Sequence, residues 1–344
     1  MTSKRKTLLI YTGGTIGMVK DYKSNALKAF DFSQILENIP ELNQLECDIE
    51  TVSFENPIDS SNMNTGYYIQ IAEIIENNYE DFDGFVVLTG SDTMSYTSSA
   101  ISFMLEHLKK PVIFTGSQLP IGYLRTDAKE NLITSIEIAS AYKDGKPIIS
   151  EVCLYFEYKL YRANRTTKLS AEQFEAFSSM NYPPLAESGV HLHFNTNLLV
   201  ESKSDLELVV RKNLCSDIVI LKLFPGIQLN VIESILNIPH LKGVVLETYG
   251  AGNAPNDKKF IKLLFDAIEK GIHIVNVTQC VGGSVLPGHY ETSSQLKEIG
   301  IIDAKDMTTE SAIAKLMYLL GVGLKKEEFI SYFEQSLRGE ITNK

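Results

Sequence analysis

Three apolar runs of this chain end in the same way, and that repetition most constrains how the chain can fold. Each run passes into a threonine, a glycine and further hydroxyl residues: residues 8–10 into Thr12-Gly13-Gly14-Thr15, residues 85–88 into Thr89-Gly90-Ser91, and residues 112–114 into Thr115-Gly116-Ser117. Short apolar runs bounded by turn residues are typical of buried strands. Ligands bind at the carboxyl ends of strands in open α/β sheets, so we expect the three loops to converge on one site.

In the rest of the chain, stretches with the hydrophobic spacing of helices alternate with stretches typical of strands. Helical spacing predicts helices at 31–36 (ended by Pro40), 68–79, 94–108, 127–142, 258–270, 308–320 and 326–337. Strands are predicted at 49–54, 151–156, 217–224, 243–249 and 271–279. This alternation predicts an α/β fold with a doubly wound, mainly parallel sheet.

A chain of 344 residues exceeds the size at which single cores stop growing, so two domains are expected. The periodicity weakens between 181 and 213, where Pro183 and Pro184 stand among polar residues. We therefore expect a larger N-terminal catalytic domain at 1–190, a linker at 191–213 and a smaller C-terminal α/β domain at 214–344.

Composition narrows the partners and the compartment. A net charge of −11 without a Lys/Arg block argues against nucleic acid and anionic membranes. The four cysteines form no CxxC pair, and buried free thiols are the better interpretation. We expect a cytoplasmic protein, because no leader and no run of roughly 18 apolar residues is present.

Thr15 is the best candidate nucleophile, although a threonine in a glycine turn is commonly only a turn or cap residue. A hydroxyl needs an activating base. None of the six histidines lies in the three loops, and His191 and His193 alternate as on a strand face rather than in a metal site. Lys168 is the alternative base, although a lysine in a polar stretch is more often solvated.

Two further side chains have both a structural and a functional interpretation. Asp92 precedes a predicted helix and could cap it, or it could hold a ligand's ammonium group or pair with Lys168. Ser60 could be a turn residue, or its hydroxyl could meet a carboxylate beside helix-start amides. The pattern Thr12-x-Gly14-x-x-Gly17 only partly matches a dinucleotide fingerprint, so a nucleotide-binding protein is the alternative from another class.

Five motifs occur in the order found in bacterial L-asparaginases: residues 11–17, 59–63, 89–94, 115–120 and 164–168. The stretches at 249–255 and 278–280 fit as well, so the resemblance covers nearly the whole chain and is nearest to the cytosolic type I enzymes. It implies hydrolysis of L-asparagine to L-aspartate and ammonia through a covalent acyl-enzyme, without a metal or organic cofactor. It also implies a homotetramer built as a dimer of dimers.

The resemblance also implies roles for individual residues. Thr15 corresponds to the nucleophile, and Ser91, Asp92 and Lys168 to the second hydroxyl–carboxylate–lysine group. Ser60 and Ser61 would meet the substrate's α-carboxylate region, Asp92 its α-ammonium group and Ser117 its amide end. Asn253 would approach the site of a neighbouring protomer.

The chain departs from the family pattern in three places. Serine stands at position 91, where the family usually has threonine, and Thr89-Gly90 stands where His-Gly is common. The lid tyrosine of many members follows the nucleophile by about ten residues, whereas Tyr22 follows Thr15 by seven. Within the same fold, glutaminase activity and the amidase subunit of a tRNA-dependent amidotransferase are the alternatives; the latter usually carries an extra N-terminal domain.

Overall fold

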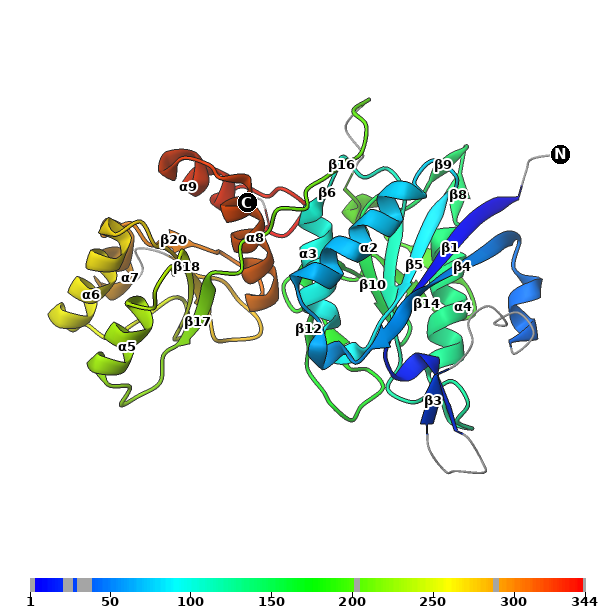
Figure 1. Cartoon of the computed structure of the whole chain (residues 1–344), viewed down its shortest axis with the longest axis horizontal. Coiled ribbons are helices and arrows are strands. Elements are labelled where there is room, and N and C mark those ends of the chain that lie inside the picture. The colour runs from blue at the N-terminus through cyan, green and yellow to red at the C-terminus, as the bar shows by residue number, and fades with distance from the viewer. Residues whose placement is uncertain (1–3, 21–26, 30–38, 201–204, 287–290, 343–344) are drawn as a thin grey trace. The chain divides into compact units, whose positions relative to one another are not determined.

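The computed structural model of the chain describes residues 4–20, 27–29, 39–200, 205–286 and 291–342 (Figure 1). The chain divides into two compact units. The first comprises Met1–Ser179 with Pro183–Lys212, and the second comprises Met180–Tyr182 with Asn213–Lys344. Each unit is built around its own sheet.

The first unit contains an eight-stranded sheet in the order β15-β14-β11-β10-β7-β5-β1-β4. The strands are β1 (Arg5–Gly13), β4 (Cys47–Ile58), β5 (Gly84–Leu88), β7 (Val112–Thr115), β10 (Val152–Phe156), β11 (Lys159–Arg162), β14 (Ala186–Ser188) and β15 (Leu192–Phe194). From β4 to β10 all neighbours are parallel, and β11, β14 and β15 continue antiparallel. β5, β7 and β10 are buried along their whole length, as expected of strands covered on both faces.

Three helices cover this sheet: α2 (Thr65–Asn77), α3 (Met94–Met104) and α4 (Ala128–Ala139). α2 and α3 lie together on one face and α4 lies on the other (Figure 1). The Asn64 side chain caps α2 by accepting the N–H of Gly66, which satisfies one of the free donors of the first turn. The mainly parallel sheet and its covering helices confirm the expected fold class.

Four short strand pairs lie outside the main sheets. They are β2 (Met18–Lys20) with β3 (Leu27–Ala29), β6 (Leu105–Glu106) with β16 (Val209–Val210), β8 (Tyr142–Lys143) with β9 (Lys146–Pro147), and β12 (Thr167–Lys168) with β13 (Phe177–Ser178).

Two of these pairs shorten predicted helices. The helix predicted to reach Leu108 ends at Met104, because Leu105 and Glu106 pair with the distant residues Val209 and Val210. The helix predicted to reach Tyr142 ends at Ala139, because Tyr142 begins a hairpin. The local hydrophobic pattern gives no information about these strand pairings, so it places both helix ends too late. The helix predicted at 31–36 lies outside the described residues.

The second unit has a four-stranded parallel sheet of β17 (Ile218–Lys222), β18 (Gly243–Thr248), β19 (His273–Thr278) and β20 (Ile302–Asp303). Its helices are α5 (Leu229–Leu236), α6 (Lys258–Glu269), α7 (Glu291–Glu298), α8 (Thr309–Val322) and α9 (Lys326–Glu334). Asp257 caps α6, and Phe260 and Leu264 bury its apolar face in the same core cluster as Leu246 of β18. This is the expected smaller α/β domain.

Most of the segment that was expected to be a linker, 191–213, is part of the first unit instead. β15 pairs with β14, and β16 pairs with β6, so residues up to Lys212 belong to the first unit. Prolines and polar residues weaken the hydrophobic periodicity of this segment, but backbone hydrogen bonds still attach its short strands β15 and β16 to the first unit. Within the described residues, every helix is too short or too polar to cross a membrane.

Candidate active site

The three strands that end in Thr-Gly are immediate neighbours in the sheet. β5 pairs in parallel with β1 on one side and with β7 on the other. Their carboxyl ends therefore lie at the same edge, as do the loops that follow them. The expected convergence of the three hydroxyl-bearing loops is present in the fold.

Glycines allow these loops to touch. A Cβ on Gly14 would collide with the backbone of Gly90, and a Cβ on Gly90 would lie 2.5 Å from the Ser60 Oγ. A Cβ on Gly116 would lie 2.5 Å from the Thr89 carbonyl oxygen. Heavy atoms cannot approach so closely without movement, so the loops after β1, β4, β5 and β7 are tightly packed against one another. Each hydroxyl residue is thereby fixed close to the others.

Thr15 begins a short 3₁₀ turn, Thr15–Gly17, directly after this contact. Gly14 has a φ of 87°, which favours glycine, and its carbonyl accepts the N–H of Gly17 at 3.2 Å. Thr15 itself is half-buried, and its hydroxyl has no hydrogen-bond partner in the described part of the chain. The backbone is thus held in a turn at Thr15, and the hydroxyl oxygen stays available with respect to the described residues.

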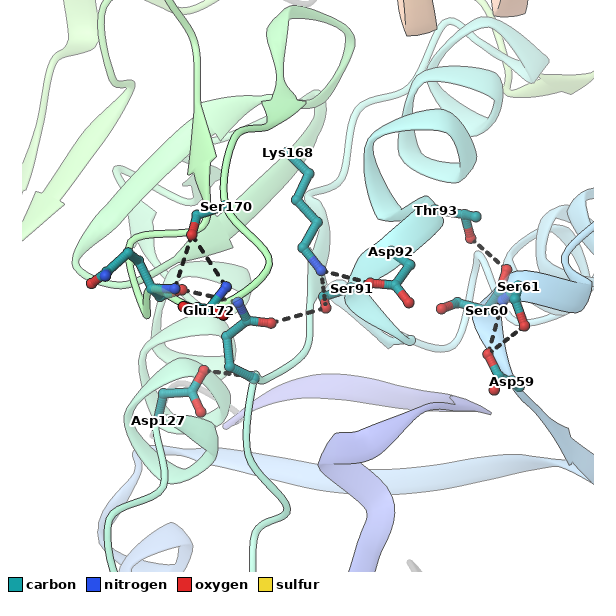
Figure 2. Close-up of polar contacts among 12 residues, drawn as sticks. Asp59, Ser60, Ser61, Ser91, Asp92, Thr93, Asp127, Lys168, Ser170 and Glu172 are labelled. Atoms are coloured by element: carbon teal, nitrogen blue, oxygen red, sulfur yellow. Dashed lines mark hydrogen bonds and ion pairs between the residues drawn. The ribbon is translucent and has the colours of Figure 1, made fainter.

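Lys168 joins the two side chains that follow Gly90 (Figure 2). Its Nζ donates to the Ser91 Oγ at 2.8 Å and to the Asp92 Oδ1 at 2.7 Å. The lysine side chain is 16% exposed and that of Asp92 is 70% exposed. The ammonium group is therefore shielded, whereas the carboxylate remains open to a ligand on its other side.

The polar stretch before Lys168 anchors it. Asn164, Arg165 and Thr166 are buried, and the Thr166 hydroxyl oxygen lies within hydrogen-bond distance of the Ser95 Oγ of α3, at 3.1 Å. Asn164 donates to α3, at the Ser102 Oγ. The common interpretation of such a stretch as a solvated loop is therefore wrong here, because these side chains have partners inside the protein.

Ser60 and Ser61 lie on a short 3₁₀ helix, Ser60–Asn62, that follows β4. The Asp59 carboxylate accepts the N–H of Ser61 at 2.9 Å and its hydroxyl at 2.8 Å (Figure 2). The Thr93 hydroxyl donates to the Ser60 carbonyl at 2.9 Å. Ser60 is buried against Gly90 and Ser61 is exposed, so this turn is tied to the Ser91–Thr93 turn.

Ser117 and Gln118 form the third loop. Ser117 is buried, and its hydroxyl donates to the Leu119 carbonyl at 2.6 Å. The Asp127 carboxylate accepts the N–H groups of Gln118 at 2.8 Å and Leu119 at 3.1 Å. Burial raises the pKa of the Asp127 carboxyl, and these two donors partly oppose that rise. The loop is therefore held by the residue immediately before α4.

Sequence reasoning missed Gln118 and Asp127. The sequence pattern presents Gln118 only as part of the third loop, and Asp127 only as the start of a helix. An aspartate at a helix start normally suggests a cap, but here its carboxylate accepts from the preceding loop instead. The order Thr115-Gly116-Ser117-Gln118 with an aspartate nine residues later is the only signal that the sequence offers.

Two predicted site residues lie outside the described part of the first unit. Tyr22 lies outside the described residues. Asn253 lies in the second unit, in a turn where its N–H donates to the Tyr249 carbonyl at 2.8 Å. The pair His191 and His193 is exposed on and beside β15, and no group of metal-binding side chains is found among the described residues.

Comparison with known proteins shows that the chain is similar to asparaginases over nearly its whole length. A family model for the N-terminal asparaginase domain matches residues 6–200, and one for the glutaminase/asparaginase C-terminal domain matches 217–333. L-asparaginase 1 of Escherichia coli K12 is 41% identical over 340 residues, covering 98% of each chain.

Two other relatives extend the comparison. The crystal structure of L-asparaginase I from Vibrio cholerae superposes with a TM-score of 0.90 at 39% identity, covering 99% of this chain and all of that one. A glutamyl-tRNA(Gln) amidotransferase subunit of Methanobrevibacter smithii is 31% identical, covering 99% of this chain and 78% of that protein. Both similarities span nearly the whole of this chain.

Proposed function

This chain belongs to the asparaginase family, and we propose that it hydrolyses L-asparagine to L-aspartate and ammonia through an acyl-enzyme on Thr15. One observation carries the proposal. The Lys168 Nζ lies within hydrogen-bond distance of both the Ser91 Oγ and the Asp92 Oδ1, in the loop that touches the Thr15 turn. A hydroxyl, a carboxylate and an amine beside a second hydroxyl are the groups that two-step amide hydrolysis needs.

In the first step, the Thr15 oxygen attacks the carbon of the substrate's side-chain amide. The carbon–nitrogen bond breaks, ammonia leaves with the proton that Thr15 gives up, and an ester remains on Thr15. The family resemblance assigns the base of this step to a lid tyrosine. Tyr22 is the candidate in this chain, and that role stays a prediction.

In the second step, water attacks the ester and Thr15 recovers its proton. Ser91, Asp92 and Lys168 position this water, because they form a hydrogen-bonded chain from an exposed carboxylate to a shielded amine. Lys168 takes up the proton that the water loses, and the Ser91 oxygen, which lies 2.8 Å from the Lys168 Nζ, holds the water as a hydrogen-bond acceptor. Such a positioned base typically contributes a factor of about 10²–10⁴ to the rate.

The polar groups around the two hydroxyls suit an amino acid. Lys168 uses one Asp92 oxygen, which leaves the exposed side of that carboxylate for the substrate's α-ammonium group. The resemblance assigns the substrate's α-carboxylate region to Ser60 and Ser61, and the N–H and hydroxyl of Ser61 are already bonded to Asp59 before substrate binds. Ser117 lines the amide end.

The proposed assembly is a homotetramer, a dimer of dimers, in which Asn253 completes the site of a neighbouring protomer. A fully active monomer in light scattering at assay concentration would contradict this part. The cytoplasmic location implied by the resemblance stays a prediction.

Ammonia release from L-asparagine and L-glutamine, measured over a range of concentrations, tests the proposal. We expect kcat/KM to be higher for asparagine than for glutamine by a factor of about 10–200. This is the discrimination that the one additional methylene group of glutamine typically permits. Equal values for the two amides would favour the glutaminase alternative instead. Thermal shifts with NAD and ATP but not with aspartate would favour a nucleotide-binding protein.

A further inference from the structure

We propose that Gln118 is a positioning residue that fixes the hydroxyl of Ser91 in the orientation that Lys168 requires. The inference rests on the proposed function, since it concerns how the Ser91–Lys168 pair is kept in working order. The motif at residues 115–120 includes Gln118 without giving it a role. The observation that carries the inference is the contact of Gln118 with both the Ser91 turn and the Gln173 turn.

The two ends of the Gln118 amide have different partners. The Nε2 donates to the Gln173 carbonyl at 2.9 Å, and the Oε1 accepts the hydrogen of the Ser91 Oγ at 3.3 Å. An amide oxygen turned toward the Gln173 carbonyl would place two acceptors against each other. The carbonyl of Gln173 therefore fixes which end of the amide faces Ser91.

The carbonyl of Gln173 is itself held in place. The Ser170 hydroxyl accepts the N–H groups of Glu172 at 3.2 Å and of Gln173 at 2.9 Å, so it fixes the turn that follows Lys168 (Figure 2). On the other side, Asp127 holds the backbone of Gln118 through its N–H. Gln118 is thus supported at its backbone and at its Nε2, and its Oε1 is directed at the site.

Serine at position 91 makes this support necessary. A serine hydroxyl can occupy three staggered rotamers, whereas the second heavy atom on the Cβ of threonine restricts this choice. With its hydrogen directed at Gln118, Ser91 presents an oxygen lone pair to the Lys168 Nζ at 2.8 Å. Gln118 thereby restricts the Ser91 hydroxyl to one rotamer, as the β-methyl group would do in a threonine.

The test combines one substitution at each of the two positions. Gln118→Met keeps the length of the side chain and removes both amide heteroatoms, and Ser91→Thr keeps the hydroxyl and adds the methyl group. We expect Gln118→Met to lower kcat about threefold to tenfold in the Ser91 background, the effect of one hydrogen bond, with KM nearly unchanged. In the Ser91→Thr background the same substitution should cost less than about twofold, because the methyl group already restricts the rotamer. Gln70→Met, at an exposed position of α2, is the matched control and should leave kcat unchanged.

Crystal structures of the same variants provide a readout that does not depend on activity. We expect Ser91 to leave the rotamer that reaches Lys168, or to divide between rotamers, in Gln118→Met, whereas the threonine of the double variant keeps one rotamer. An unchanged single rotamer of Ser91 in Gln118→Met would overturn the inference, and so would equal losses of kcat in the two backgrounds. Wild-type protein that releases no ammonia from asparagine would contradict the proposed function instead, and the Ser91 rotamers would still decide the inference.

Discussion

The backbone of Gly14 lies directly against the backbone of Gly90, with no room between them for a Cβ atom on Gly14. Thr15 follows the first glycine and Ser91 follows the second, so this contact brings together the turns that carry the two candidate hydroxyls, after β1 and after β5. The glycines are therefore part of the candidate site and not only turn residues.

Gly14→Ala should abolish activity and lower the free energy of unfolding by about 1–3 kcal/mol or more. The added methyl group meets backbone atoms that cannot move without displacing the Ser91 loop. Gly145→Ala is the control for a positive φ without a close contact, because Gly145 has a φ of 77° and open space surrounds it. The control should cost only about 1–2 kcal/mol from backbone strain and leave activity unchanged. Urea unfolding and ammonia release measure both effects, and similar losses in the two variants would argue against the contact.

Thr15→Ala should keep the fold and lose nearly all activity, by several orders of magnitude in kcat, because the nucleophile is removed. Thr15→Ser keeps a hydroxyl and should retain a measurable part of the rate. Circular dichroism and thermal unfolding check the fold, and ammonia release checks the rate. Activity near the wild-type level in Thr15→Ala would refute the assignment of the nucleophile.

Lys168→Met should slow both acylation and deacylation, with a loss in kcat of about 10²–10⁴. The substitution removes the Nζ that holds the Asp92 Oδ1, and so loosens the carboxylate proposed to bind the substrate in both steps; it also removes the contact with the Ser91 Oγ, which acts in the second. Rapid-quench measurement of the first turnover and steady-state ammonia release separate the two steps. Lys143→Met, at an exposed hairpin position, is the control. If only the steady-state rate falls, Lys168 acts on the ester alone.

The acyl group should form on Thr15 and not on Ser91. By its contacts alone Ser91 looks better activated, since Lys168 and Asp92 stand beside it. The family pattern nevertheless assigns the acyl group to the glycine-turn threonine, which works if a lid supplies a base once substrate is bound. A diazo-ketone analogue of asparagine traps the nucleophile, and mass spectrometry of the digest locates the adduct. An adduct on the Ser91 peptide alone would reverse the two roles.

Glu157→Gln should stabilise the protein at pH 8 and much less at pH 5. Burial, followed by the charges of Asp127, Glu130 and Glu175, raises the pKa of Glu157 from 4.5 to about 7. Between these two values the folded state binds more protons than the unfolded state. The free energy of unfolding therefore falls as pH rises through this window, and glutamine removes that loss.

Urea unfolding of wild type and Glu157→Gln at the two pH values measures the difference. Glu137→Gln, on the exposed side of α4, is the matched control. A stabilisation of Glu157→Gln that is the same at pH 5 and pH 8 would show that proton uptake by Glu157 does not cause it.

Much of the fold and part of the candidate site could be predicted from local patterns. Apolar runs that stop at Thr-Gly predict buried strands, and β1, β5 and β7 lie where they were expected. Helix ends were less predictable, because the end of α3 depends on Val209 and Val210, more than a hundred residues away. The burial of Asn164 and Thr166 was also not predictable, since their partners lie on α3.

The sequence by itself determined which groups are available: the glycines that permit close turns, the hydroxyls that follow them, and the order of motifs that marks the family. Only the tertiary structure decided which of these groups meet. Lys168 contacts Ser91 and Asp92 across 77 and 76 residues of chain, and Gln118 contacts Ser91 across 27. Residue type and turn geometry are local properties of the chain. The order of strands in a sheet follows from burying both faces of the whole unit at once, and it is this order that brings the loops of β1, β5 and β7 to one edge.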